Sequence, residues 1–164
     1  MQRAIKPVFL AFLLSLAFTS VVRAQGCSDE SVDLRYQKGS ARFSVEIAAD
    51  ADIRAVGLMN RDSLPRTAGM LFIYEEPVDP VFWMKNVNFS LDMLFADATG
   101  TVTHIHHMAK PYDETHIPGG RDVQFVLEIN GGMAEALAIE TGAEMRHPMI
   151  NQSNAAWPCD EGTE

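Results

Sequence analysis

Apolar and polar residues alternate along much of the chain. In residues 41–47, Phe43, Val45 and Ile47 occupy every second position, and polar side chains stand between them. Successive side chains of a strand point to opposite faces, so this alternation predicts a strand with one buried face. Residues 123–129 have the same period and predict another strand of this kind.

Residues 80–97 form the stretch around which the rest of the chain is organised. Their sequence, PVFWMKNVNFSLDMLFAD, has two apolar runs on either side of a short polar loop that contains Lys85 and Asn86. This pattern predicts two strands joined by the loop. Residues 97–100 are typical of a hairpin turn, which leads into a further strand at residues 101–108.

Two short helices complete the expected elements. Asp50 is a good N-cap for a helix through about residue 59, with Ile53, Val56 and Leu58 available to the core. The glycine pair at 131 and 132 begins a second helix through about residue 139. Further strands are expected at residues 32–36, 69–74 and 143–148, with a long loop at 109–121. The pattern predicts a mainly β fold: a single-domain β-sandwich or partly open barrel with two short helices.

The first 24 residues have the pattern of a signal peptide. Two basic residues precede an apolar run at residues 8–22, and a small-residue pattern that ends at Ala24 offers a cleavage point. A retained membrane anchor is the alternative, but polar residues interrupt the run, which is short for a spanning helix. We therefore expect a signal peptide at 1–24, a single β-rich domain at 25–164, no integral membrane span after cleavage, and a periplasmic or secreted location.

The charge of the chain argues against nucleic acid as a partner. The formal net charge is −9, and loss of Arg3, Lys6 and Arg23 with the signal peptide would make it −12. A surface that binds phosphates needs clustered Lys and Arg, whereas the basic residues here are scattered singly. Binding of nucleic acid and adsorption to anionic lipid are therefore not expected, and the oligomeric state stays open.

The two cysteines stand near the two ends of the expected domain. Cys27 and Cys159 would form a disulfide in an oxidising compartment, and such a long closed loop stabilises by roughly 4 to 5 kcal/mol in the chain-entropy model. Lipidation of Cys27 is the alternative, although Ala24 and Gln25 give a poor context for it.

Several separated motifs give the chain a family resemblance. They are Gly57, Leu58 and Met59 with Arg61, residues 69–72, residues 82–86, Leu91 and Asp92 with Phe95, Leu127 with Glu128, and Gly132 with Gly142. With these motifs, about residues 43–147 resemble the domain of unknown function 192 family of bacteria and archaea. The resemblance implies a compact β-sandwich or partly open barrel, often exported, and no assigned reaction. Ser90 and Val87 depart from the pattern, where the family usually has proline and threonine.

Polar groups inside otherwise apolar motifs are the candidate ligand-binding residues, together with one tryptophan. The set is Arg61, Trp83, Lys85, Asn86, Asp92 and Glu128. We interpret them as the polar floor and aromatic wall of a cleft for a small ligand, with Trp83 largely buried and Lys85 and Asn86 at the rim. The alternative is structural: a buried carboxylate needs donors, and Arg61 is the natural ion-pair partner for Asp92.

Three histidines form a weaker candidate for a metal site. His104 and His106 would share one face of a strand, with His107 beside them, at a spacing that suits copper or zinc ligation. A solvent-facing edge strand accounts for the same histidines without any metal, and no cofactor is specified by the sequence.

A hydrolase is a further alternative with little support. Ser90 stands beside Asp92, but the chain has no Gly-x-Ser-x-Gly motif. The leading hypothesis is an exported, non-enzymatic domain that binds a small molecule, a cell-envelope component or a protein partner.

Overall fold

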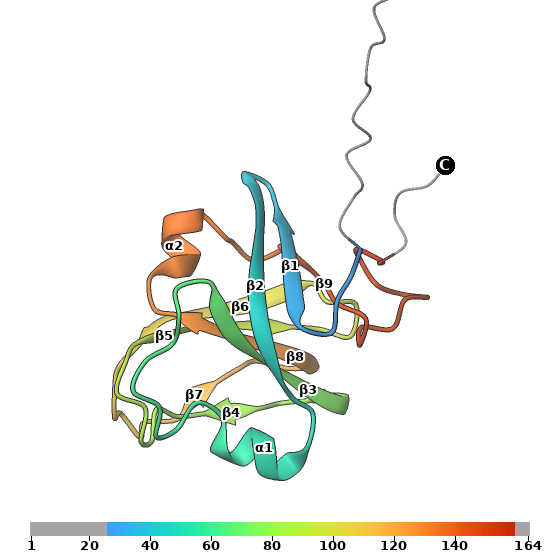
Figure 1. The fold of residues 1–164 in the computed structure, drawn as a ribbon. Helices are drawn as coiled ribbons and strands as arrows, with labels where there is room; N and C mark the ends of the chain where they lie inside the picture. The colour runs from blue at the N-terminus through green and yellow to red at the C-terminus, as the bar shows by residue number, and fades with distance from the viewer. Residues whose placement is uncertain (1–25, 160–164) are drawn as a thin grey trace, which may run out of the picture.

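The computed structural model describes residues 26–159, so the predicted signal peptide at 1–24 lies outside the described residues. The strands are β1 (Ser31–Tyr36), β2 (Gly39–Ala48), β3 (Ala68–Val78), β4 (Val81–Phe82), β5 (Leu91–Ala96), β6 (Val102–Ala109), β7 (Ile117–Pro118), β8 (Val123–Asn130) and β9 (Glu144–Arg146), and the helices are α1 (Ala51–Val56) and α2 (Met133–Leu137) (Figure 1). No helix in this part of the chain has the length and apolar character needed to cross a membrane.

Seven strands form one curled sheet in the order β6-β5-β8-β3-β2-β1-β9, and β4 pairs with β7 in a small second sheet. All pairs are antiparallel except β2 with β3. The two edges of the main sheet approach each other, because Thr101 bridges to Glu144 and the Val102 N–H donates to the Ala143 carbonyl at 2.8 Å. The predicted partly open, mainly β fold is therefore confirmed.

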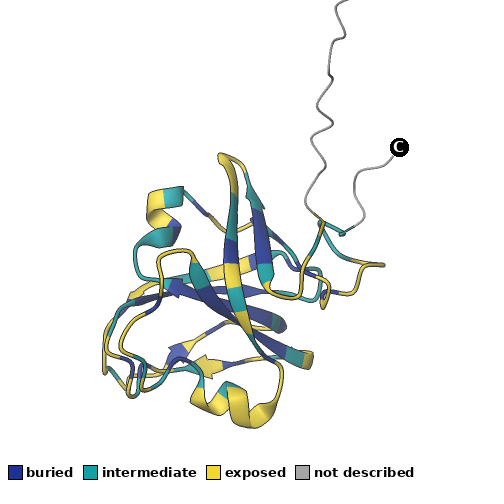
Figure 2. Cartoon of the chain, viewed as in Figure 1, coloured by how far each residue is buried: buried dark blue, intermediate teal, exposed yellow. Residues whose placement is uncertain are grey.

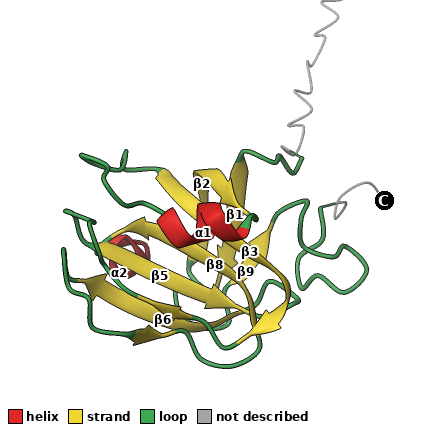
Figure 3. Ribbon diagram, turned by 90° about the horizontal axis from the view of Figure 1, so that it is seen from below, coloured by secondary structure: helices red, strands yellow, loops and turns green. Residues whose placement is uncertain are grey.

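The main sheet buries apolar side chains on both faces. Phe43, Val45 and Ile47 pack into the cluster on one face, as their alternation predicts. The other face of β3, β5 and β8 carries a second cluster that includes Met70 and Met93. Figure 1 shows α1 and the β4–β7 pair on one side of the main sheet. In Figure 3, the view from below, α1 lies in front of the strands of this sheet. Strands covered on both sides become almost continuously buried, and all six residues of β5 are buried.

Helix α1 is shorter and more exposed than its sequence predicts. The Asp50 side chain caps it by accepting from the Asp52 N–H, as expected, but the helix ends at Val56. Gly57, at φ 51°, adopts a conformation that other residues rarely take, and so ends the helix early. Of the three residues expected in the core, Leu58 is buried, at 2% exposure, but the expectation is wrong for Ile53 and Val56, which are 49% and 55% exposed. Much of α1 is coloured as exposed in Figure 2.

The predicted long loop at residues 109–121 is not wholly irregular. It contains β7, whose Ile117 lies opposite Phe82 of β4. The pairing is confined to two residues on each strand, too short for periodicity in the sequence to indicate it.

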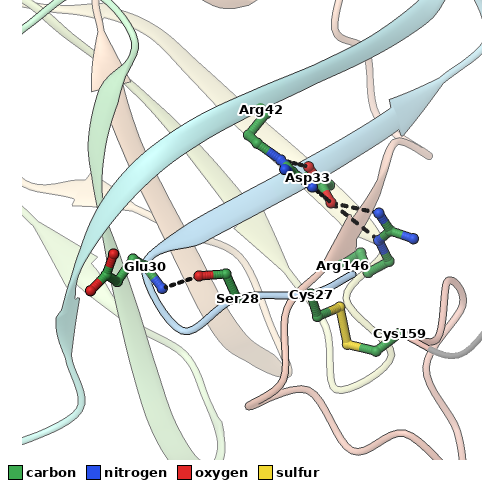
Figure 4. Close-up of polar contacts among 7 residues, drawn as sticks. All are labelled: Cys27, Ser28, Glu30, Asp33, Arg42, Arg146 and Cys159. Atoms are coloured by element: carbon green, nitrogen blue, oxygen red, sulfur yellow. Dashed lines mark hydrogen bonds and ion pairs between the residues drawn. A yellow bond between two sulfur atoms is a disulfide. The ribbon is translucent and has the colours of Figure 1, made fainter. Parts of the chain in front are cut away.

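The two ends of the domain are joined covalently and by an ion-pair cluster. The predicted disulfide between Cys27 and Cys159 is present, and Asp33 of β1 lies between two arginines (Figure 4). Arg42 of β2 and Arg146 of β9 approach its Oδ2 at 2.8 and 2.7 Å. Burial acts to raise the pKa of Asp33, but the hydrogen bonds from both arginines outweigh it and hold the pKa below its ordinary value.

Candidate functional site

A cleft of about 240 Å³ lies between α1 and the second face of the main sheet; we name it the α1 cleft. Its lining comes from α1 and the residues that follow it, from β3, from β4 and the loop after it, and from β8. The lining residues are Arg54, Ala55, Val56, Gly57, Leu58, Met59, Phe72, Tyr74, Val81, Phe82, Trp83, Val87 and Glu128.

Aromatic rings form the walls of the α1 cleft. Phe72 and Phe82 pack edge to face with their ring centroids 5.2 Å apart, and Phe82 makes a similar contact with Phe95 at 5.6 Å. The Arg54 guanidinium lies 4.9 Å from the ring centroid of Tyr74. These rings come from β3, β4 and β5 and belong to the second core cluster or pack against it, so the core itself holds the walls in place.

Glu128 lies at the floor of the α1 cleft. Strand β8 places it between Met70 of β3 and Met93 of β5, and the residue is only 4% exposed. Burial raises the pKa of Glu128 to about 8, so the carboxyl group is mostly protonated at neutral pH.

Among the residues that the structure describes, none is a hydrogen-bond or ion-pair partner of the Glu128 carboxyl group. Within residues 26–159 no hydrogen bond or ion pair reaches it, although every described side-chain N or O atom that is fully cut off from solvent has a partner. The carboxyl oxygens of Glu128 therefore open onto the α1 cleft, where a ligand or water can reach them.

The prediction that Trp83 is largely buried is wrong. Its side chain is 41% exposed and lines the α1 cleft, and the Lys85 Nζ lies 5.4 Å from the centroid of its ring. The first strand predicted in residues 80–97 ends at Phe82, and in the segment after it Met84, at 0% exposure, is the residue that points to the core. Which side chain of a segment outside a regular strand is buried depends on what covers it, and periodicity cannot specify that.

Asp92 has a structural role that differs from the predicted ion pair. Its Oδ1 accepts from the Met108 N–H at 2.9 Å, and its Oδ2 accepts from the Ala134 N–H at 2.8 Å. Both donors are backbone groups, so Asp92 ties the start of α2 and the end of β6 to β5. Arg61 pairs instead with Glu46 of β2, with 2.8 Å between Nη2 and Oε2.

Arg61 and Asn86 lie together in a second hollow of about 170 Å³, separate from the α1 cleft. The Asn60 N–H donates to the Asn86 carbonyl at 2.8 Å, and Asn86 has a positive φ of 54°. The six predicted ligand-binding residues are thus divided: Trp83 and Glu128 share one cleft, Arg61 and Asn86 share another, Lys85 lies against the Trp83 ring, and Asp92 lines neither.

The three histidines of β6 do not form a ligand set. His104 stacks on Phe95, with ring centroids 5.6 Å apart, and His106 lies opposite Met93. Burial, followed by the neighbouring His104 and His107, lowers the pKa of His106. In the described part of the chain, no group of three or more His, Cys, Asp or Glu residues could hold a metal ion.

The hydrolase alternative gains no support from the arrangement around Ser90. A catalytic triad needs a carboxylate that orients a histidine, whereas the Asp92 carboxylate is engaged by two backbone N–H groups. Within residues 26–159 the hydroxyl of Ser90 has no hydrogen bond to a histidine.

Sequence reasoning missed Arg54, Phe72 and Tyr74 as cleft residues. Phe72 and Tyr74 alternate with Met70 in the predicted strand at 69–74, so the sequence places them on one face. Their proximity to Glu128 depends on the antiparallel pairing of β3 with β8, which the sequence does not reveal.

Comparison with known proteins identifies the family but no activity. The DUF192 family model, described as "Uncharacterized ACR", matches residues 34–147, and the chain belongs to this family. A protein of unknown function from Novosphingobium aromaticivorans DSM 12444 is 36% identical, with a TM-score of 0.69 over 70% of this chain and 82% of that chain. A protein from Sinorhizobium meliloti 1021, described as a candidate transcription regulator, is 35% identical, with a TM-score of 0.69 over 75% and 96%. No curated protein matches the chain.

Proposed function

We propose that this DUF192 member is an exported, non-enzymatic domain that binds a small molecule in the α1 cleft. The observation that carries the proposal is the Glu128 carboxyl group, which is buried, opens onto the cleft and has no partner among residues 26–159. An unpaired polar group in an apolar layer costs stability, and a ligand that forms a hydrogen bond with it offsets that cost.

The mouth of the α1 cleft also supports binding. Val56, Val81 and Trp83 line it and are exposed, at 55%, 58% and 41%. Apolar side chains gathered in this way around an opening are typical of a surface that meets a ligand. The cleft therefore combines apolar walls and rim with one polar group at its floor, which is the usual composition of a small-molecule site.

Export is part of the same proposal. The pattern of residues 1–24 favours a periplasmic or secreted protein. The Cys27–Cys159 disulfide fits an oxidising compartment, where such bonds persist. A fusion of residues 1–30 to a reporter that is active only outside the cytoplasm tests export, and an inactive reporter would contradict it.

Two tryptophan substitutions on α1 test whether the cleft binds. Ala55 lines the cleft and is exposed, so Ala55→Trp should obstruct the opening without disturbing the core. Ala51 is exposed on the same helix and does not line the cleft, so Ala51→Trp is the matched control.

The measurement is native mass spectrometry of protein purified from the cell envelope of its host. Wild-type protein and Ala51→Trp should carry the same bound small molecule, and Ala55→Trp should lose it. Wild-type protein without any bound small molecule, or equal occupancy in the Ala55→Trp variant, would contradict the proposal.

A further inference from the structure

We infer that the ligand of the α1 cleft is an organic ammonium ion, an amine with a compact apolar body whose N–H groups bind the carboxyl of Glu128. This inference rests on the proposed function and adds the chemical class of the ligand. It is carried by the arrangement of one unpartnered acid at the floor beneath aromatic walls.

The floor favours a cationic donor. Glu128 lies between Met70 and Met93 across the neighbouring strands, and neither side chain supplies a hydrogen-bond donor. An ammonium group brings N–H donors and a positive charge together, and a charge-assisted hydrogen bond is about twice as strong as a neutral one. An alcohol would bring only the hydrogen bond.

The walls also favour a cation. The faces of aromatic rings attract positive charge, and Phe72, Tyr74, Phe82 and Trp83 all line the cleft. The Lys85 ammonium group already lies 5.4 Å from the centroid of the Trp83 ring, which shows that this ring accepts a cation on one side.

The other titratable groups of the cleft restrict the number of charged groups that the ligand can carry. Besides Glu128, the lining in the described chain contains only Arg54 of α1 and Tyr74 of β3 as titratable side chains. Arg54 lies over the Tyr74 ring, and its Nη1 donates to the Ile73 carbonyl at 2.9 Å. Its positive charge disfavours a second cationic group nearby, so the site suits a monoamine rather than a diamine.

Binding of an ammonium ion should release a proton. Because burial raises the pKa of Glu128 to about 8, the empty site holds a neutral carboxylic acid below that pH. The incoming R–NH3+ stabilises the carboxylate, so the carboxyl O–H bond breaks, the ion pair forms, and one proton passes to the buffer.

Isothermal titration calorimetry at pH 6.5, in two amine-free buffers of different ionisation enthalpy, tests the inference. The probes are 2-phenylethylamine, the neutral 2-phenylethanol, and the anion 3-phenylpropionate. We expect the amine to bind about tenfold or more tightly than the alcohol, with release of about one proton per site. The anion should bind more weakly than the amine, because it brings no positive charge to Glu128 and its own carboxylate loses water in the apolar cleft.

Two variants make the result specific to Glu128. Glu128→Gln keeps the shape of the side chain and removes the ionisable proton, so it should bind the amine about tenfold more weakly and release no proton. Ala55→Trp should bind none of the probes, and Ala51→Trp should behave as wild type. Far-ultraviolet circular dichroism of each variant confirms that it is folded.

The outcomes separate the inference from the proposed function. If amine and alcohol bind equally well and Ala55→Trp loses both, the cleft binds small molecules but the ammonium inference is overturned. If no probe binds, or if the amine binds without proton release, the inference is also overturned, and the native mass spectra still decide the proposed function separately. A bound native molecule without an amine group would overturn the inference alone.

Discussion

Replacement of Glu128 by glutamine should change how the stability of the protein depends on pH. Burial raises the pKa of Glu128 from the ordinary value of 4.5 to about 8 in the folded protein. The unfolded chain releases this proton near pH 4.5, whereas the folded protein keeps it until about pH 8. The contribution of Glu128 to stability is therefore fully present below pH 4.5 and is lost as the pH rises through 8.

The size of the effect follows from the two pKa values. One pKa unit of difference corresponds to about 1.4 kcal/mol, so the wild-type protein loses about 3 kcal/mol between pH 4.5 and pH 7 and about 4 kcal/mol between pH 4.5 and pH 9. Glu128→Gln has no proton to lose at this position. Relative to wild type, it should gain about 3 kcal/mol at pH 7 and about 4 kcal/mol at pH 9, measured from the difference at pH 4.5.

Urea unfolding at pH 4.5, 7 and 9 measures this difference. Other groups also respond to pH: burial lowers the pKa of His147, and the pKa of Asp33 is held low by its arginines. Because the wild type and Glu128→Gln both contain these groups, the difference between their free energies of unfolding reports the effect of Glu128 alone. Glu46→Gln is the matched control, since the Glu46 side chain is largely exposed and its pKa is lowered by its bond to Arg61. A difference between wild type and Glu128→Gln that stays constant from pH 4.5 to 9 would refute the reasoning.

Three further predictions concern stability. Asp92→Ala leaves two backbone N–H groups without their acceptor and should lower the free energy of unfolding by about 2 to 4 kcal/mol in urea titrations. A loss below about 1 kcal/mol would contradict the structural role of Asp92. Reduction of the Cys27–Cys159 disulfide, which spans 132 residues of sequence, should lower the free energy of unfolding by about 5 kcal/mol in the chain-entropy model. Free thiols in the non-reduced protein, detected by alkylation and mass spectrometry, would disprove the bond itself. Arg146→Ala removes a largely buried partner of Asp33 and should lower the free energy of unfolding by about 2 to 3 kcal/mol. Arg61→Ala breaks a more exposed ion pair and should lower it by about 1 kcal/mol or less. Equal losses would contradict the idea that burial makes the first ion pair the stronger one.

Local patterns in the sequence determined most of the secondary structure. The period of two in residues 41–47 and 123–129 predicts strands β2 and β8 and the division of most of their side chains between two faces, because this period is a property of the extended backbone itself. Asp50 could be identified as a helix cap because capping depends on neighbours only two or three residues away. The disulfide followed from only two cysteines at the two ends of one domain.

The tertiary structure alone decided which polar groups meet. Asp92 was expected to pair with Arg61, but β5 delivers it to two backbone N–H groups, and Arg61 reaches Glu46. Likewise, Trp83 lines the α1 cleft and is 41% exposed rather than buried in the core, because it follows the end of β4 and no strand period fixes the direction of its side chain.

The position of Glu128 shows most clearly what the sequence alone does not determine. Alternation places it on one face of β8, and a sheet with only one covered face would leave that side chain in water. Because α1 and the β4–β7 pair cover the second face, the same glutamate is buried between Met70 and Met93 at the floor of a cleft. Face assignment depends on a two-residue period, but burial depends on which distant segment packs on that face, and only the folded chain specifies that contact.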